Sequence, residues 1–432
     1  MIRCAFCEKD ITPPLGTIIP GDFGARYSDG VIKPLMVRAM TVSDGEKSAA
    51  IAVVDSCGLY ADVTEAVRKK VAETTNLPSD AVMVMATHSH SAGPTLNWGE
   101  QIRTNLQYLE MLATRTADAI TEAFHNMKEV SVRKNTSVLD GVSFIRVFKM
   151  KNGGLKTNPG VGNPDIIEPA CEIDREISVA YILDNEKPIG AIINFALHPA
   201  IVCGTKSHGD YISIISEEMK KAFGDGFITL FINGACGNIN HINPFDKKTV
   251  EPGIHDIIGA KIAECAISLL KDAEETDGSI SYASSKIKLR RRRADASAIA
   301  DAVKHLDSLG DELENAGPGT PGYIETFFAL QAMISRSDRT IFTETELQAI
   351  KVGDIHIYGV PAQIFCEFGV EIKKNAPFSM VSAFANDYIG YIPTPECMKP
   401  GVYEARLAST SRHTAEAGSE ICKEMAKLHK KL

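Results

Sequence analysis

Five short apolar runs, each followed at once by polar residues, constrain the fold of this chain most strongly. Runs of about four to eight apolar residues are typical of strands buried on both faces, with helices packed outside the sheet. In open α/β sheets, ligands bind beyond the carboxyl ends of the strands. The sequence therefore predicts an α/β protein with a mixed β-sheet core, helices packed outside it, and a polar site at the carboxyl ends of the strands. The runs cover residues 49–54, 82–86, 191–197, 227–232 and 381–385.

The run 82–86 leads into two histidines, His88 and His90, before Gly93 and Pro94 end the segment. Because side chains alternate along extended backbone, both imidazoles can point the same way. Such a pair suits two metal ligands, or one ligand beside a proton-transfer base. A polar loop that merely contains two histidines is the alternative.

The other runs end in side chains of the same kind. A proline that cannot donate to a sheet ladder follows His198, so this histidine is expected at a strand end. Chance could place one or two such residues at strand ends, but the full set favours one shared site. The set comprises Asp55, His88, His90, His198, Asn240, His241 and Tyr391.

Composition excludes several classes of protein. Of 432 residues, 44% are apolar and 23% are charged, which is ordinary for a globular protein. The net charge of −9 argues against a nucleic-acid partner. No apolar stretch approaches the roughly 18 residues that a membrane span needs. The charged N-terminus and the ten scattered cysteines predict a cytoplasmic protein with reduced thiols.

Helical periodicity fills the segments between the runs, and the whole chain, 1–432, is expected to form a single catalytic domain. Residues 294–335 differ, because two helical patterns flank a break rich in glycine and proline. We interpret this segment as a helical insertion that either caps the site or packs against a second subunit in a homo-oligomer. The helices are expected over 62–74, 106–127, 213–223 and 254–270.

Two further segments carry structural expectations. Residues 152–173 are expected to form a long loop without regular structure, and loops of that length are usually functional. The basic run 290–293 is expected to lie on an edge strand whose charged face is solvated.

Five segments of the chain together resemble a known family. They are DITPP at 10–14, THSHSAGP at 87–94, NFALHP at 194–199, GACGNIN at 234–240 and NDYIGY at 386–391. With these segments in collinear order, the chain resembles the neutral/alkaline non-lysosomal ceramidases, and among them the compact bacterial members. The helical insertion carries little of this resemblance.

The resemblance implies a zinc ion held by His88, His198 and Tyr391. The fourth ligand of the family is a glutamate, and its position falls on Gln363 in this chain. An amide oxygen can touch a metal but brings no charge, so this change predicts weaker binding. Glu367 could substitute, although a surface or helix-capping role is the more ordinary reading of it.

The resemblance also implies the catalytic groups. The proposed general acid/base of the family falls on His90, while Arg146 and Tyr403 fall on the residues that bind the substrate carbonyl. The serine assigned as nucleophile in some members aligns with Asn240, which closes an acyl-enzyme route at that position. Asn240 is instead a candidate for substrate binding.

The remaining candidates are weighed against ordinary structural roles. Asp55 and Asp210 are expected to stand behind the metal ligands and orient them, or to cap a loop or a helix. Arg26, His241 and Trp98 are candidates for lining the substrate pocket, with packing or a loop role as the alternative.

These observations predict a metal-dependent hydrolase, with zinc as the ion, that acts on a linear amide or other acyl compound. A small-molecule substrate other than ceramide is expected, because the sequence shows no membrane-docking helix. One alternative is another metal-assisted reaction on the same scaffold. The other is a degenerate domain that binds a small ligand without hydrolysis, because Gln363 replaces the metal-binding glutamate.

Overall fold

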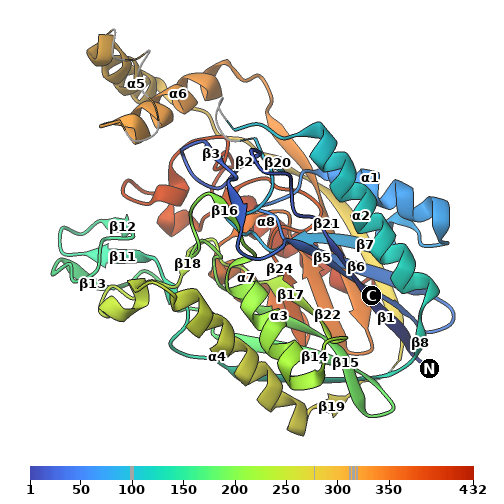
Figure 1. Ribbon diagram of the computed structural model, residues 1–432. Coiled ribbons are helices and arrows are strands. Elements are labelled where there is room, and N and C mark those ends of the chain that lie inside the picture. Colours follow the sequence, from blue (N-terminus) through green and yellow to red (C-terminus); the bar gives the residue numbers. More distant parts are fainter. Residues whose placement is uncertain (98–101, 277, 311–312, 314–316, 318–319) are drawn as a thin grey trace.

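The centre of the protein consists of two five-stranded β-sheets that face each other (Figure 1). Side chains from both sheets, among them Met40, Ile51, Ile192 and Leu230, share one buried apolar cluster. The α/β class and the mixed sheets expected from the sequence are therefore confirmed. The computed structural model describes residues 1–97, 102–276, 278–310, 313, 317 and 320–432.

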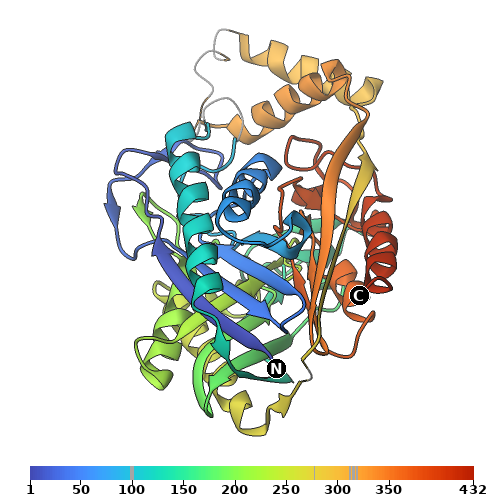
Figure 2. The same ribbon diagram turned by 90° about the vertical axis from the view of Figure 1, so that its right-hand side faces the viewer.

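The first sheet is mixed, and helices cover its outer face (Figure 2). Its strands β6 and β7 are parallel, while the other neighbours are antiparallel. The covering helices are α1 (Ala61–Thr74) and α2 (Leu106–His125). In spatial order the strands are β7 (Val82–Ala86), β6 (Ser48–Val54), β5 (Met36–Ser43), β1 (Arg3–Asp10) and β8 (Lys128–Glu129).

The second sheet has the same design, with one parallel pair formed by β15 and β17. Its outer face is covered by α3 (Asp210–Phe223) and α4 (Ile254–Leu269). In spatial order the strands are β17 (Ile228–Asn233), β15 (Lys187–Phe195), β14 (Glu176–Asp184), β9 (Ser131–Val138) and β19 (Glu274–Glu275).

The layers therefore run helix, sheet, sheet, helix. The apolar runs correctly predict strands buried on both faces with helices packed outside, and the structure adds that two sheets share the core between the helix layers. The inner face of each five-stranded sheet is buried by another sheet. An apolar side chain is buried equally well by a strand or a helix, so the pattern alone could not distinguish the two.

A four-stranded sheet completes the core and joins the other two. The Ala86 N–H donates to the Phe384 carbonyl (3.1 Å), and the Asn233 amide donates to the Thr87 carbonyl (3.0 Å). These bonds tie together the carboxyl ends of β7 and β17 and the segment that contains Phe384. The strands are β20 (Ile280–Arg290), β21 (Phe342–Val352), β22 (Ile355–Gly359) and β24 (Ser379–Ser382), with α7 (Cys366–Lys373) and α8 (Ala417–His429) packed beside them.

The segment 294–335 is largely helical, as expected, and projects from the body at the top of Figure 1. It contains α5 (Ala296–Leu309) and α6 (Tyr323–Ser337). Phe327 and Phe328 of α6 pack against Phe23 and Tyr403, so this segment borders the loops that carry candidate site residues.

Short strand pairs line the loops between the main elements. They are β2 (Ile18–Ile19) with β3 (Arg26–Tyr27), β4 (Gly30–Val31) with β16 (Lys206–Ser207), β10 (Phe144–Ile145) with β18 (Ile239–Asn240), and β23 (Gln363–Ile364) with β25 (Tyr391–Ile392).

The expectation that residues 152–173 form a long loop without regular structure is wrong. This segment contains β12 (Leu155–Thr157) and β13 (Ile166–Pro169), which pair on either side of β11 (Val147–Met150). The glycines and prolines that suggested a loop form the turns between these short strands.

The basic run 290–293 is only partly on a solvated strand. Arg290 is exposed at the end of β20, but Arg291 and Arg292 are half-buried beyond it. Arg291 pairs with Asp338 (2.7 Å), and Arg292 donates to the Ser411 carbonyl (2.9 Å). The expectation of a fully solvated face is therefore wrong for these two residues.

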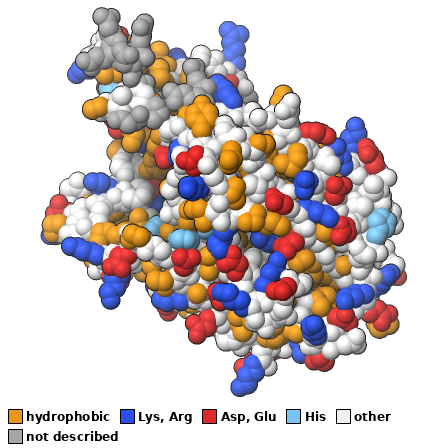
Figure 3. All heavy atoms as spheres, viewed as in Figure 1, with side chains coloured by type: hydrophobic (Ala, Val, Ile, Leu, Met, Phe, Trp, Pro, Cys, Tyr) orange, Lys and Arg blue, Asp and Glu red, His pale blue; other side chains and the backbone are white. Residues whose placement is uncertain are grey.

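Charged side chains of both signs are spread over the surface. On the face shown in Figure 3, basic and acidic side chains are interspersed over the molecule. Within the described parts of the chain, no helix combines the length and apolar character that a membrane crossing requires.

A close contact between α3 and α4 generates the first prediction. A Cβ atom added at Gly259 would lie 2.5 Å from the Ile214 Cβ and 2.7 Å from the Tyr211 carbonyl oxygen. We expect Gly259→Ala to lower the free energy of unfolding by about 1–3 kcal/mol, because the helices must separate. Urea denaturation measures this. Gly226→Ala is the control, since a Cβ there meets no atom of the described residues within 4 Å. Equal destabilisation by both would contradict the packing argument.

Candidate functional site

Three imidazoles from the two facing sheets meet at the carboxyl ends of their strands. His88 and His90 follow β7, and His198 follows β15. The Nε2 atom of His90 lies 3.3 Å from that of His88 and 3.2 Å from that of His198. The site edge expected from the strand ends is thus where these three histidines converge.

Backbone geometry at His88 aims its ring into this cluster. His88 has φ +71°, a left-handed conformation that costs a non-glycine residue on the order of 1–3 kcal/mol. The expectation of extended backbone through His88 and His90 is therefore wrong. The His88 Nδ1–H donates to the Cys57 carbonyl, which leaves the Nε2 lone pair facing the other imidazoles. The ring stacks on Phe384 with centroids 4.0 Å apart.

His90 is fixed by a glycine and an arginine. Gly21 has φ +104°, and a Cβ there would lie 2.8 Å from the His90 Nδ1. Arg26 donates to the His90 carbonyl (2.8 Å). Burial, helped by the charge of Arg26, lowers the pKa of His90 to about 3. This imidazole is therefore neutral at physiological pH.

The other two imidazoles are also neutral. Burial lowers the pKa of both His88 and His198 well below the ordinary value, and the nearby Arg146 lowers it further. Neutral imidazole is the form that binds metals. The Cys236 backbone partly offsets this lowering at His198, whose Nδ1 makes no hydrogen bond of standard geometry with any described residue.

Gln363 presents an unpaired oxygen to the cluster. Its Nε2 donates to the Tyr388 hydroxyl, and its buried Oε1 makes no hydrogen bond of standard geometry with any described residue. The side chain lies close enough to His88 to affect the pKa of that histidine. The imidazole nitrogens of His88 and His198, together with this amide oxygen, are donor types that a borderline divalent cation such as Zn²⁺ accepts. The residues present therefore fit a metal ion.

Arg146 links this cluster to the tyrosine expected at the metal. Its guanidinium donates to the Tyr391 hydroxyl (3.1 Å) and to the Gly237 carbonyl (2.7 Å). Tyr391 pairs with Gln363 through β23 and β25, which places both residues on this side of the site.

Glu404 is a site residue that the sequence reasoning missed. Its Oε1 lies 2.6 Å from the Arg146 Nε, a close charge contact outside standard hydrogen-bond geometry. Burial alone would lower the pKa of Arg146, but Glu404 reverses the direction and raises it. The available signal was its position next to Tyr403, in the segment singled out for that tyrosine.

Tyr403 lies between Tyr391 and helix α6. Its ring centroid lies 6.0 Å from that of Tyr391 and 6.1 Å from that of Phe328 in α6. Burial raises the pKa of Tyr403, so its hydroxyl keeps its proton and can donate it in a hydrogen bond.

The candidates for substrate binding are spread more widely. Asn240 donates to Asn158 (2.8 Å) and accepts from the Ile242 N–H (3.0 Å), so its side chain is engaged in loop structure. His241 is half-buried, and burial lowers its pKa to about 4. Neither makes a hydrogen bond to the three histidines within the described chain. Trp98 lies outside the described residues.

The two expected carboxylates hold loops. Asp55 pairs with Arg38 (3.2 Å) and accepts from the Met36 N–H (2.9 Å), and none of its hydrogen bonds in the described structure goes to a site histidine. Asp210 accepts from the N–H groups of Ile201 (2.9 Å) and Val202 (2.8 Å), which fixes the loop that follows His198.

Glu367 does not stand in for the missing glutamate. Its carboxylate lies with two cysteines, Cys171 and Cys366, and Asn238 donates to it (2.8 Å). A separate group of metal-ligand type contains His88 and His90. Glu367 therefore belongs to another part of the structure.

Comparison with known proteins shows the fold. No protein-family model matches the chain, and no curated protein does. The chain has a ceramidase-like fold: it resembles the crystal structure of neutral ceramidase from Pseudomonas aeruginosa with a TM-score of 0.73 and 15% sequence identity, over 99% of this chain and 74% of that one. A structure described as ceramidase complexed with C2 matches with the same values.

The buried imidazoles predict acid sensitivity of the metal-free protein. Because the pKa of His90 falls from 6.5 to about 3 on folding, the unfolded chain binds the proton more readily. The free energy of unfolding should therefore fall as the pH is lowered from 6.5 toward 3, by about 1.4 kcal/mol per pH unit for this one histidine.

Urea unfolding in the presence of a chelator measures this slope across the window. We expect His90→Asn to reduce the slope and His125→Asn, at an exposed histidine on α2, to leave it unchanged. An identical slope in wild type and His90→Asn would contradict the argument.

Proposed function

We propose that this protein is a metal-dependent hydrolase, with zinc as its ion, that cleaves a linear amide or another acyl compound. The observation that carries the proposal is the convergence of three neutral imidazoles, from His88, His90 and His198, beside the unpaired Gln363 oxygen. The ceramidase-like fold supports the same conclusion.

The ligand roles proposed here come from the resemblance to the ceramidases, and the convergence of the histidines supports them. His88, His198 and Gln363 would hold the ion together with Tyr391. When bound, a divalent ion of this kind lowers the pKa of a water molecule and polarises a carbonyl group. His90 would accept a proton at Nε2, because its Nδ1 faces Gly21. The same nitrogen would then donate that proton to the leaving amine.

Arg146 and Tyr403 would bind the substrate carbonyl oxygen. Glu404 balances the charge of Arg146 and fixes its guanidinium, so the donors are held in place before the substrate arrives. Each donor directed at a developing oxyanion typically contributes roughly 3–4 kcal/mol. Arg26 would shape the pocket through its hydrogen bond to the His90 carbonyl.

The side of the site near α6 suggests the nature of the acyl group. Tyr403 packs with Phe23, Phe327 and Phe328 in one apolar cluster. An acyl group reaching past Tyr403 would meet these side chains, whereas the amine would lie toward the histidines. We therefore propose a substrate with a short apolar acyl chain and a small polar amine, and not ceramide.

A second candidate function is ligand binding without hydrolysis. Gln363 is the observation that favours it, because its amide brings no negative charge to the ion. In this case the pocket would hold an acyl compound and leave it intact.

The first test is turnover of a panel of N-acyl amines, with ceramide included, by the zinc-loaded protein. We expect hydrolysis of short-chain amides, and a reduction of kcat by about 10²–10⁴ in His90→Asn, because proton transfer is lost. The matched control is His125→Asn on the exposed face of α2. Binding of the same amides without turnover would support the second candidate and contradict the first.

The second test concerns the ion itself. We expect Gln363→Glu to raise zinc affinity and His198→Ala to lower it, each by about tenfold or more, since the first adds a charged ligand and the second removes a nitrogen. Competition with a chromophoric chelator measures both. Gln107→Glu, on the surface of α2, should change nothing. If His198→Ala binds zinc as wild type does, the ligand assignment is wrong.

A further inference from the structure

A second cluster of metal-ligand side chains lies apart from the histidines. It consists of Cys171, Cys366 and Glu367, whose ligand atoms all lie within 4.8 Å of one another. Cys366 is buried, whereas Cys171 and Glu367 are half-buried. Two sulfurs and a carboxylate from segments far apart in the chain therefore converge at one partly accessible point.

Local structure holds these groups in place. Cys366 and Glu367 begin α7, and Cys171 follows β13. The Cys366 Sγ lies 3.5 Å from the Glu367 Oε2. The amide of Asn238 donates to the Glu367 Oε2 (2.8 Å) and to the Cys171 Sγ (3.4 Å), while its oxygen accepts from the Cys366 N–H (2.9 Å).

The electrostatics of the cluster favour a cation. Cys366, burial and Glu367 together raise the pKa of Cys171, because negative charges at one point repel each other. A divalent ion would remove this repulsion and let the thiols lose their protons. The N–H donors of Asn238 and the positive end of α7 also stabilise the charged forms of these ligands.

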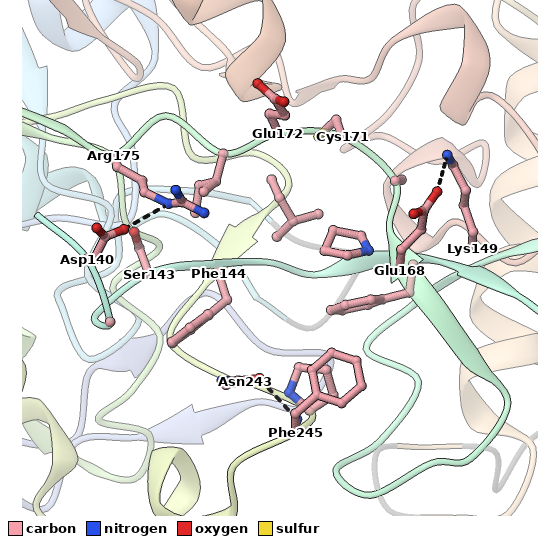
Figure 4. Close-up of a pocket in the computed structure, with 17 residues that line it drawn as sticks. Asp140, Ser143, Phe144, Lys149, Glu168, Cys171, Glu172, Arg175, Asn243 and Phe245 are labelled. Atoms are coloured by element: carbon pink, nitrogen blue, oxygen red, sulfur yellow. Dashed lines mark hydrogen bonds and ion pairs between the residues drawn. The ribbon is translucent and has the colours of Figure 1, made fainter. Parts of the chain in front are cut away.

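A pocket gives access to the cluster. Cys171 lines a cavity of about 750 Å³, where it lies beside Glu172 on the stretch of chain bordering the pocket (Figure 4). Phe144 and Phe245 line the same cavity, but none of the three site histidines does. An ion or a water molecule could therefore reach Cys171 without passing the histidine site.

We propose that Cys171, Cys366 and Glu367 form a second metal site for a thiophilic divalent cation such as Zn²⁺ or Cd²⁺. Thiolate and carboxylate are established zinc ligands, and sulfur selects soft ions over Mg²⁺ or Ca²⁺. A water molecule from the pocket would be the fourth ligand of the ion. Each thiol that binds the ion releases its proton to solvent, so no oxidant or reductant is required.

The site would also brace the wall that carries Arg146. The Asn238 carbonyl accepts from the Arg146 N–H (2.9 Å), and the Gly237 carbonyl next to it accepts from the guanidinium. An ion held by Cys171, Cys366 and Glu367 would fix the turn at Asn238 and hence the position of Arg146. Metal binding at the cysteines does not itself depend on the proposed hydrolase activity.

The test is titration of the full-length, fully reduced protein with Cd²⁺, followed by the ultraviolet thiolate-to-metal charge-transfer band. We expect the wild type to show this band and Cys171→Ser and Cys366→Ser each to weaken it strongly. Two controls should keep it: Cys203→Ser, at an exposed cysteine, and Cys57→Ser, which removes the thiol beside His88.

Glu367→Gln keeps the test decisive if a serine variant does not fold. It preserves the shape of the side chain and is expected to weaken Cd²⁺ binding about tenfold, with an unchanged circular dichroism spectrum. The proposal is overturned if the wild type shows no thiolate band, if the band is lost only in Cys57→Ser, or if folded Glu367→Gln binds Cd²⁺ as tightly as wild type.

Discussion

The candidate site depends on the burial of His88 and His198 beside the half-buried His90, with no carboxylate among the described groups that contact them. Desolvation lowers the pKa of His88, His90 and His198, so all three are neutral. The His90 Nε2 lies 3.3 Å from that of His88 and 3.2 Å from that of His198, and because neutral rings at these distances cannot all donate to one another, lone pairs are left facing a common point. That arrangement is costly without a cation and favourable with one.

The charge of Arg146 beside the histidines is balanced by Glu404. Glu404 is fully buried against Arg146, and this pair leaves no net charge at the wall. A buried ion pair of this kind fixes the position of the guanidinium more than it stabilises the fold, because desolvation offsets much of the attraction. With Gln363 in place of a carboxylate, an ion bound by the histidines would keep more of its positive charge. Such an ion would bind less tightly but would polarise a carbonyl more strongly.

Much of the fold and the histidine cluster could be predicted from the sequence, because both follow from local patterns. Apolar runs mark β6, β7, β15 and β17, and a polar residue after such a run is at a strand end whatever the topology. The packing of sheet on sheet could not be predicted, because an apolar run indicates that a strand is buried but not whether a helix or another sheet buries it. Glu404 and the convergence of Cys171 with Glu367 depend on loop conformations that no periodicity encodes.

The turn at residues 237–238 connects the two regions of chemistry in this molecule. Its carbonyls hold the backbone and the guanidinium of Arg146, and the Asn238 side chain holds Cys171 and Glu367. Gly237 is needed there, because a Cβ would lie 2.5 Å from the Gln363 carbonyl oxygen. One tight turn therefore sets the distance between β23, which carries Gln363, and the arginine. Any group that stiffens Asn238 acts on the geometry of the histidine site through this turn, without contacting a histidine.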